Sequence, residues 1–369
     1  MRNIRNWLVA AMCCAAFSVS LRAQSVPFDP DRWTISAQES RVEEYLGRRS
    51  LLLKGGLAVV KDSAFTDGVI EFDIAFTGER GFLGAVWRLQ DDGNYEEFYV
   101  RPHQSGNPDA NQYTPAFNGV TGWQLYYGEG YGVPVRYRFN EWLHIKIVVA
   151  GQQAEVYIVD MDKPALFVHE LKRERKEGRV GLSAGNFAPA HFSNFSFNAR
   201  EKPALKSAPR TTAAAPAGTV MSWHVSNVFA EKSLEGKYQL TAADKAALTW
   251  RRLDAESTGV TNLARVQGVS RDKNTVFARV TIVSDKEQVK KVRFGFSDRV
   301  KVYFNDRLIY GGSDNYQSRD YRFLGTIGYF DELYLPLQRG ENELWLAVSE
   351  DFGGWGVKAL IEQMAGIRF

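Results

Sequence analysis

Four side chains able to transfer a proton or hold an anion lie close together in the first half of the chain. They are Arg88, Glu96, Glu97 and His103. A carboxylate and an imidazole can act as base and acid at a reacting bond, and a guanidinium can hold a negatively charged group. The four residues would serve a glycoside-active hydrolase or lyase, which is the alternative to a protein that binds its ligand unchanged. A surface interaction protein without a small ligand is the second alternative.

The same region continues into a long connection, residues 95–131, that mixes amides, carboxylates and aromatic rings. Connections of this length are functional or disordered, and this one is too aromatic for disorder. A sugar needs a flat ring and several hydrogen-bonding groups. We therefore expect carbohydrate binding, with a structured insertion that packs its own aromatics as the alternative. The expected ligand-binding residues are Arg88, Glu97, Arg101, His103, Gln104, Asn107, Asp109, Gln112, Tyr113, Asn118, Trp123 and Trp355.

Two of these residues are tryptophans that could stack on a sugar ring. Trp123 begins a run, residues 123–127, with the composition of a short strand, and the turn at residues 119–122 would leave its ring near a loop mouth. Trp355 closes the glycine-rich loop at residues 351–355. Its ring is either an exposed sugar platform or a buried anchor.

Other catalytic and metal-binding signatures are weaker. Glu71 and Asp73 share one strand face, but the third acid of a laminarinase-type motif is missing, so a solvent-facing strand is the better interpretation. Asp91, Asp92 and Asn94 could hold a structural Ca²⁺ through oxygen ligands, although the same residues make an ordinary turn. The histidines are scattered, and no other cofactor is expected.

The first 23 residues have the features of a secretory signal peptide. Arg2 and Arg5 precede an apolar run that ends in small residues. Cys13 and Cys14 lie within it, so the mature protein would have no disulfide. Without residues 1–23 the formal net charge is zero, which favours neither nucleic acid nor an anionic membrane as a partner. We expect a secreted, periplasmic or cell-envelope protein that binds a glycan and is not inserted in the membrane after cleavage.

The rest of the chain consists of short segments in which apolar and polar residues alternate. Residues 142–149 are the clearest case. This period is typical of half-buried strands, and turn signals recur at the spacing of a β-sandwich. Residues 201–219 differ, because they are rich in Pro, Ala and Thr, lack aromatics and cannot bury enough surface to fold. We expect an all-β protein of two antiparallel β-sandwich domains, residues 26–200 and 220–369, joined by this Pro/Ala-rich linker.

Four stretches of the N-terminal domain follow an informative order along residues 67–197. They read DGVIEFDIAF, GFLGAVWRLQDDGNYEEFYVRP, EWLHIKIVVAGQQAEVYIVD and GRVGLSAGNFAPAHFSNFSF. In this order they resemble the concanavalin-A-like, laminin-G-like jelly roll. Arg88, followed by the Tyr95-Glu96-Glu97 run, is similar to the bacterial group labelled 3-keto-disaccharide hydrolase-like. That resemblance implies glucose-type ligands, and it transfers no catalytic mechanism.

The C-terminal domain carries a second resemblance. The segments VKVYFNDRLIYGG and LPLQRGENELWLAVSEDFGGWGVKALI are similar to the hairpin and the following strand of the galactose-binding-like jelly roll found as an accessory module in glycosidases. Asp306 stands where that family usually has Gly. Many such modules are structural, so this resemblance implies a jelly-roll fold and does not establish sugar binding.

Overall fold

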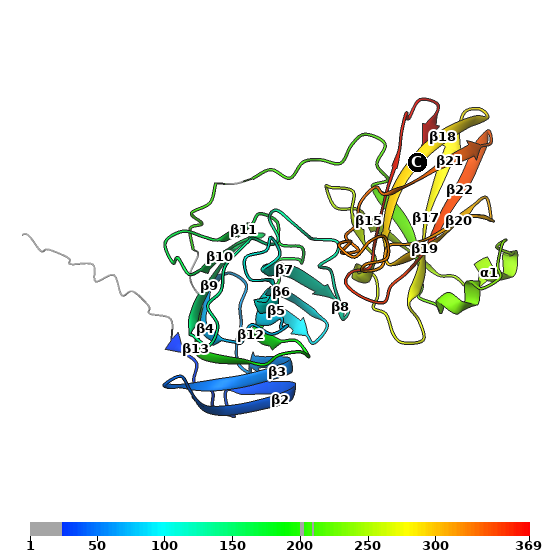
Figure 1. The fold of residues 1–369 in the computed structure, drawn as a ribbon. Coiled ribbons are helices and arrows are strands. Elements are labelled where there is room, and N and C mark those ends of the chain that lie inside the picture. Colours follow the sequence, from blue (N-terminus) through cyan, green and yellow to red (C-terminus); the bar gives the residue numbers. More distant parts are fainter. Residues whose placement is uncertain (1–23, 200–202, 209) are drawn as a thin grey trace, which may run out of the picture.

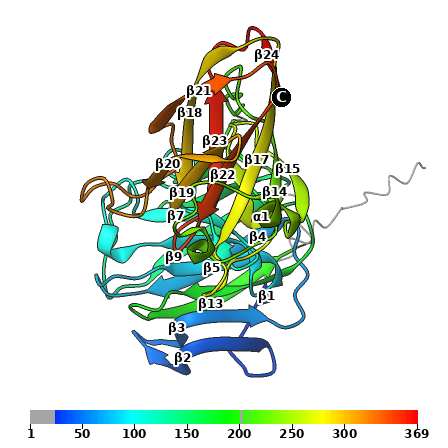
Figure 2. The same cartoon turned by 90° about the vertical axis from the view of Figure 1, so that its right-hand side faces the viewer.

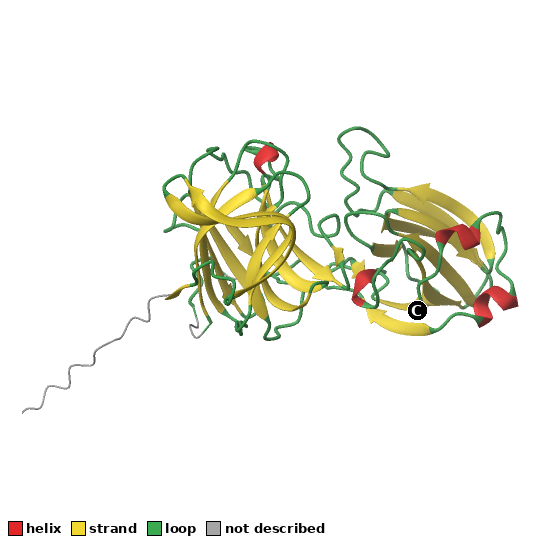
Figure 3. Cartoon of the chain, turned by 90° about the horizontal axis from the view of Figure 1, so that it is seen from below, coloured by secondary structure: helices red, strands yellow, loops and turns green. Residues whose placement is uncertain are grey.

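The computed structural model describes residues 24–199, 203–208 and 210–369. The signal-like segment, with Cys13 and Cys14, lies outside these residues. Nearly all regular structure is antiparallel strand, arranged in two sandwiches (Figure 1; Figure 3). The all-β, jelly-roll fold class expected from the sequence is confirmed. Within the described part of the chain, no helix has the length and apolar character needed to cross a membrane.

The N-terminal sandwich is one antiparallel sheet that curls back on itself. Its elements are β1 (Gln24–Ser25), β2 (Trp33–Tyr45), β3 (Arg48–Val60), β4 (Gly68–Ala75), β5 (Leu83–Asp91), β6 (Asn94–Val100), η1 (Pro102–Gln104), β7 (Asn111–Phe117), β8 (Val120–Thr121), β9 (Leu143–Ala150), β10 (Gln153–Ile158), β11 (Leu166–Val168), β12 (Arg179–Ala184) and β13 (Ala190–Asn198). The strand order is β11-β10-β9-β4-β13-β3-β12-β5-β6-β7-β8, and β2 extends from β3 as a ribbon away from the second sandwich (Figure 2).

Strand β3 belongs to both layers of this sandwich because it bends in the middle. Residues 51–53 pair with β13, whereas residues 56–59 pair with β12. Gly55 at the bend has a φ of 64°, a conformation that glycine adopts without strain. The bend places β10, β9, β4 and β13 in one layer and β12, β5, β6 and β7 in the other, with the main hydrophobic core between them.

Alternation along β6 separates an inner face from an outer face. Phe98 and Val100 point into the core, so Glu97 and Tyr99 point the other way. Tyr99 lies opposite Gly84 of β5. We call the outer side of β5, β6 and β12, where Glu97 and Tyr99 lie, the β6 face.

The C-terminal sandwich has two separate sheets. Its elements are β14 (Ser222–Ser226), η2 (Glu231–Leu234), α1 (Ala242–Ala246), β15 (Trp250–Asp254), β16 (Thr261–Asn262), η3 (Leu263–Arg265), β17 (Thr275–Ser284), β18 (Gln288–Ser297), β19 (Arg299–Phe304), β20 (Arg307–Ser313), β21 (Asp331–Leu337), β22 (Gly340–Ser349), β23 (Gly356–Ile361) and β24 (Ile367–Arg368). One sheet has the order β15-β14-β17-β22-β19-β20, with β24 paired to β17, and the other has the order β16-β23-β18-β21.

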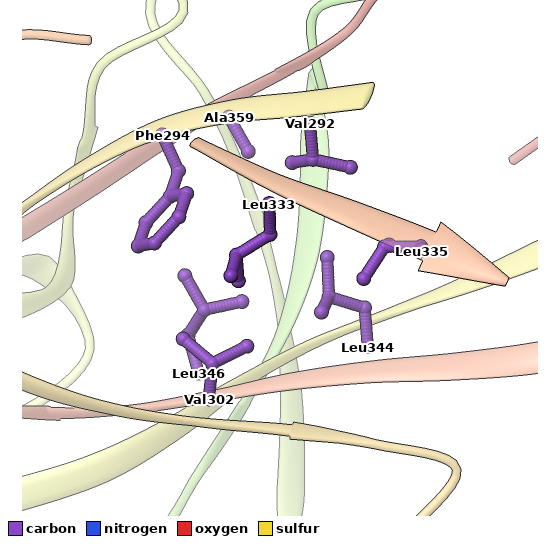
Figure 4. Close-up of a pocket in the computed structure, with 8 residues that line it drawn as sticks. All are labelled: Val292, Phe294, Val302, Leu333, Leu335, Leu344, Leu346 and Ala359. Carbon is purple, nitrogen blue, oxygen red and sulfur yellow. The ribbon is translucent and has the colours of Figure 1, made fainter. Parts of the chain in front are cut away.

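The interior of the C-terminal sandwich is closed to ligands. Eight aliphatic and aromatic side chains surround a void of about 10 Å³ between the two sheets (Figure 4). A void of this size is at the lower limit for one water molecule and offers it no polar partner. We conclude that this space is ordinary core packing.

One segment of the N-terminal half packs into the C-terminal sandwich. Phe117 and Val120 belong to the hydrophobic core of the C-terminal sandwich, and Leu125 packs with Val260. Residues 123–127, expected as a strand, form a turn in which the backbone N–H of Leu125 donates to the carbonyl of Gly122. The turn ends the β-structure here because it must fit against the neighbouring domain rather than against a sheet.

Gln124 forms four hydrogen bonds across this contact. Its backbone N–H donates to the carbonyl of Gly353 at 2.9 Å, and its side-chain amide donates to the carbonyl of Leu324 at 2.9 Å. Its carbonyl accepts from Ile327, and its Oε1 accepts from the Ser297 hydroxyl. Because Gln124 is buried, each of its polar groups needs such a partner.

Ser207, Arg210 and Thr212 of the predicted linker lie against the N-terminal sandwich. The backbone N–H of Ser207 donates to Glu155, and Arg210 pairs with Glu129. Further along, the hydroxyl of Thr212 lies 3.1 Å from a ring nitrogen of His169. The low-complexity segment therefore follows the protein surface, and each half of the chain still has its own hydrophobic core.

Candidate functional site

The β6 face carries three of the polar residues that the sequence singles out, Glu97, Arg101 and Gln112. Glu97 and Tyr99 lie on β6 itself, and Arg101 follows on the same side. Gln112 of β7 lies directly opposite Tyr99. Its amide is held by the carbonyl of Tyr126, so the loop after β8 covers the β7 end of this face.

Glu97 is the most unusual group on this face. Its side chain is partly exposed, and no Lys, Arg or His of the described residues forms a salt bridge with it. Burial raises the pKa of Glu97 to about 7, and the Ser183 hydroxyl lowers it by a smaller amount. Such a carboxyl is available to accept hydrogen bonds from a ligand, because no protein cation competes for it.

A loop at the end of β6 brings further predicted residues together. Arg101 forms a salt bridge with Asp109 at 2.6 Å. Gln104 accepts a hydrogen bond from Asn107 at 2.7 Å. These four residues lie in one polar loop next to the β6 face, and they bond to one another rather than standing free.

His103 in this loop is neutral at physiological pH. Burial, together with the charges of Arg101 and Arg80, lowers its pKa to about 4. Its Nδ1 accepts a long hydrogen bond, 3.4 Å, from the backbone N–H of Gly81. The ring therefore offers a ligand a flat face and its second ring nitrogen, and it does not supply a proton.

Two phenylalanines that the sequence analysis did not select complete an aromatic patch here. Phe82 lies 5.5 Å from the His103 ring and 5.8 Å from the ring of Phe187, centroid to centroid. Phe187 is 48% exposed, and the guanidinium of Arg80 lies 4.4 Å from its centroid. Tyr99 could have been found from its strand period with Glu97, but no local signal in residues 185–188 connects Phe187 with this loop.

The predicted catalytic group does not assemble. Arg88 is buried and donates to the Thr66 carbonyl and to Asp67 at 3.0 Å. Its guanidinium is therefore already paired within the protein. Glu96 points into the core, opposite to Glu97, since neighbouring strand residues face opposite sides. His103 lies beyond the strand end, and the four residues from Glu97 to Arg101 alone span about 13 Å.

The three predicted aromatic ligand residues are buried instead. Tyr113 is in the N-terminal core, where its hydroxyl donates to Glu96 at 2.6 Å. The ring of Trp123 packs against Phe352 of the second sandwich, 5.9 Å between centroids. Trp355 is fully buried and donates its indole N–H to a backbone carbonyl at 3.0 Å. The sugar-stacking role expected for these rings is corrected accordingly, because their faces are covered by protein.

The acidic turn between β5 and β6 folds onto itself. Both oxygens of Asp91 accept hydrogen bonds from the Asn94 amide, and one also accepts from the N–H of Gly93. Asp92 is exposed. No group of three or more potential metal ligands is present among the described residues. The geometry is that of a hydrogen-bonded turn, which was the second interpretation of the sequence.

A separate polar cluster occupies the outer side of the other layer. Asp73 of β4 contacts His144 of β9 at 2.7 Å, and its second oxygen accepts from Arg48 and from the amide of Asn194. Burial would raise the pKa of Asp73, but the bonds from His144 and Asn194 and the charge of Arg48 outweigh it and lower the pKa. The bond to Asp73 raises the pKa of His144. Asp73 is therefore an ion-pair partner rather than half of a catalytic carboxylate pair.

This cluster predicts a stability contribution that depends on pH. The raised pKa of His144 means that its contribution is complete below about 6.5 and is lost as the pH rises through the folded-state value. The lowered pKa of Asp73 means that its contribution is present above about 3.8 and is lost at lower pH. The difference in melting temperature between wild type and His144→Gln should be largest between pH values of about 3.8 and 6.5. This difference should become smaller at higher pH. The exposed His224 provides the control, since His224→Gln should give a gap independent of pH.

Comparison with known proteins assigns no family to this chain. No family model matches the chain, and no curated protein matches it. Among solved structures, the chain is similar to the carbohydrate binding module CBM66 from Bacillus subtilis, with 18% identity, 45% of this chain and 94% of the other covered, and a TM-score of 0.35. A Bacillus licheniformis beta-glucanase matches at 10% identity over 48% of this chain and 97% of the other, with a TM-score of 0.34. A family 35 carbohydrate binding module from an environmental isolate matches at 16% identity over 26% of this chain and 70% of the other, with a TM-score of 0.19.

Proposed function

We propose that this protein binds a neutral glycan on the β6 face and does not cleave it. The observation that carries the proposal is Glu97, a partly exposed carboxyl without a salt bridge on a sheet face bordered by aromatic rings. Phe82 and Phe187 offer apolar faces to the C–H side of a sugar ring, while Glu97 and nearby side chains offer hydrogen bonds to its hydroxyls. Glucose-type sugars, implied by the resemblance of the sequence, are the first ligands to test.

The arrangement favours binding over hydrolysis. Glycosidases of the usual kind place two carboxyl groups about 5–10 Å apart on either side of the scissile bond. Glu96 and Glu97 point to opposite faces of the sheet, so they cannot flank one bond. His103, with its pKa lowered to about 4, carries no proton to give to a leaving group at neutral pH.

Replacing Glu97 with Gln tests the proposal through a pH profile. Since the pKa of Glu97 is about 7, the carboxylate forms between pH 6 and pH 8, and glycan affinity of wild type should rise across that range. The Glu97→Gln variant should show no such rise and should bind about tenfold more weakly at pH 8, the difference expected for one charge-assisted hydrogen bond. A glycan array identifies the sugar, and calorimetry at several pH values measures the affinity.

The melting temperature of Glu97→Gln shows whether weaker binding comes from the lost carboxylate or from unfolding. A carboxyl whose pKa is raised from 4.5 to about 7 favours folding below the lower value, and that contribution disappears as the pH rises through 7. Glu97→Gln should therefore melt no lower than wild type at pH 8. The exposed Glu44 gives the matched control, Glu44→Gln, with unchanged affinity. Equal affinity of Glu97→Gln and wild type at pH 8, or release of reducing sugar by wild type, would refute the proposal.

The proposal includes export. The expected signal peptide at residues 1–23 would place the protein in the envelope or the medium of a bacterium, where glycans are accessible. The assignment to the 3-keto-disaccharide hydrolase-like group is likewise part of the proposal. It rests on the Arg88 and Tyr95-Glu96-Glu97 pattern, two of whose charged groups face inward.

A further inference from the structure

A second site lies where the two sandwiches meet. A cleft of about 370 Å³ opens there, and its lining comes from both halves of the chain. Leu253 of β15 and Arg265 at the end of η3 belong to the C-terminal half. The N-terminal half contributes Arg88, Gln90, Asn94, Phe117, Asn118, Arg173, Glu174 and Lys176. Neither half forms this cleft alone.

The lining has an excess of unpaired positive charge. Arg173, Lys176 and Arg265 form no salt bridge with a carboxylate of the described residues, and Glu174 is the one acid in the lining. Neighbouring Arg175 is different, because it pairs with Asp67 at 2.6 Å. A cleft with three such cations and one acid attracts a negatively charged ligand.

Phe117 holds two of these guanidinium groups in place. The Arg173 guanidinium lies 4.6 Å from the centroid of its ring, and the Arg265 guanidinium lies 5.7 Å from it. Arg173 donates from Nη1 to the Ala116 carbonyl and to Asn94. Its Nε and Nη2, and the whole guanidinium of Arg265, donate to no acceptor in the described part of the chain. Guanidinium groups with free N–H donors can pair with the oxygens of a carboxylate.

Amide oxygens stand beside the cations. Gln90 donates its Nε2 to the backbone carbonyl of Glu177 at 2.7 Å. Asn118 donates its Nδ2 to the backbone carbonyl of Ala264 at 2.7 Å. Each bond fixes the amide while its oxygen has no donor among the described residues. These oxygens can accept hydrogen bonds from hydroxyl groups.

We propose that this cleft binds a carboxylated sugar, a uronic acid residue of an acidic glycan, with its carboxylate on Arg173 and Arg265 and its hydroxyls on Gln90 and Asn118. The volume is at the small end of ligand sites, about 300–1,000 Å³, so the cleft accepts one or two sugar residues. The site differs in position and in ligand charge from the β6 face, and it does not depend on the function proposed there.

Titration calorimetry of the full chain with galacturonic acid, digalacturonate and galactose tests this site. The two acids should bind and galactose should not, and binding should weaken as salt is raised, because exposed charges are screened. Arg265→Gln and Lys176→Gln change exposed side chains, so each should fold as wild type does and lower the affinity for digalacturonate. For Arg265, which offers a direct bond, the expected loss is about tenfold. Glu174→Gln should raise the affinity, since it removes the one negative charge.

Two controls distinguish this site from general charge attraction and from the β6 face. Arg210→Gln removes an exposed arginine elsewhere on the surface and should leave digalacturonate binding unchanged. Glu97→Gln should also leave it unchanged, whatever that variant does to neutral glycans. Equal affinity for galactose and galacturonic acid, or equal loss in Arg210→Gln and Arg265→Gln, would overturn the proposal. Binding of inorganic phosphate as tight as that of digalacturonate would also overturn it, because it would show an anion site without selection for a sugar.

Discussion

The variant Glu256→Ala is expected to lose about 3–5 kcal/mol of unfolding free energy, the usual result of removing one partner of a buried ion pair. Glu256 of the C-terminal half accepts from Lys172 of the N-terminal half at 2.8 Å and also from the Tyr126 hydroxyl. The Lys172 side chain is 2% exposed, and it also pairs with the partly exposed Glu170 at 3.0 Å. Burial would lower its pKa, but the charge of Glu256 outweighs this and raises the pKa. Urea unfolding at pH 7 measures the loss.

Matched variants show whether the loss comes from the buried charge. Glu129 forms an exposed pair with Arg210, so Glu129→Ala should change stability by less than about 1 kcal/mol. The double variant Lys172→Met with Glu256→Leu removes both charges and should recover most of the loss. A loss in Glu256→Ala no greater than that in Glu129→Ala would mean that the pair does not hold the two halves together.

The variant Trp355→Ala is also expected to lose about 3–5 kcal/mol of unfolding free energy. The side chain is fully buried in the C-terminal core, and its indole N–H donates to the carbonyl of Val348 at 3.0 Å. Truncation leaves a cavity and an unpaired carbonyl. Guanidinium unfolding measures the loss, and the glycan affinity of the folded variant should equal that of wild type.

An exposed aromatic residue of the same domain provides the comparison. Tyr321 is 77% exposed, so Tyr321→Ala should cost less than about 0.5 kcal/mol. A loss of similar size in the two variants, or a loss of glycan binding by folded Trp355→Ala, would support the sugar-platform interpretation of Trp355 against the buried one.

The parts of the fold that could be predicted are those with a hydrophobic period. The alternation in residues 142–149 predicts β9, and the Asn305-Asp306 pair predicts the hairpin between β19 and β20, where both residues have positive φ. Strand β2 has no such period, because most of its residues are exposed on both faces. Its thirteen residues pair along β3 as a ribbon, so no apolar stripe marks them in the sequence.

The candidate site could be predicted only where it follows the strand period. Alternation places Glu97 and Arg101 on one face of β6, and it also places Glu96 on the other face. The two tryptophans could not be resolved in this way. Trp123 and Trp355 both stand next to glycines, a context that fits an exposed loop and a tight packing contact equally well. Whether Trp123 meets solvent depends on Phe352, which is more than two hundred residues away in the sequence.

The packing of residues 117–125 into the second sandwich has a consequence for solubility. A fragment that ends near residue 200 would carry Phe117, Val120, Trp123 and Leu125 without the surface that covers them. Contiguous exposed apolar groups of this kind promote self-association. The linker at residues 201–219 is thus a poor place to divide the chain for expression. Each piece would self-associate through the apolar surface that is buried between the two sandwiches in the intact protein.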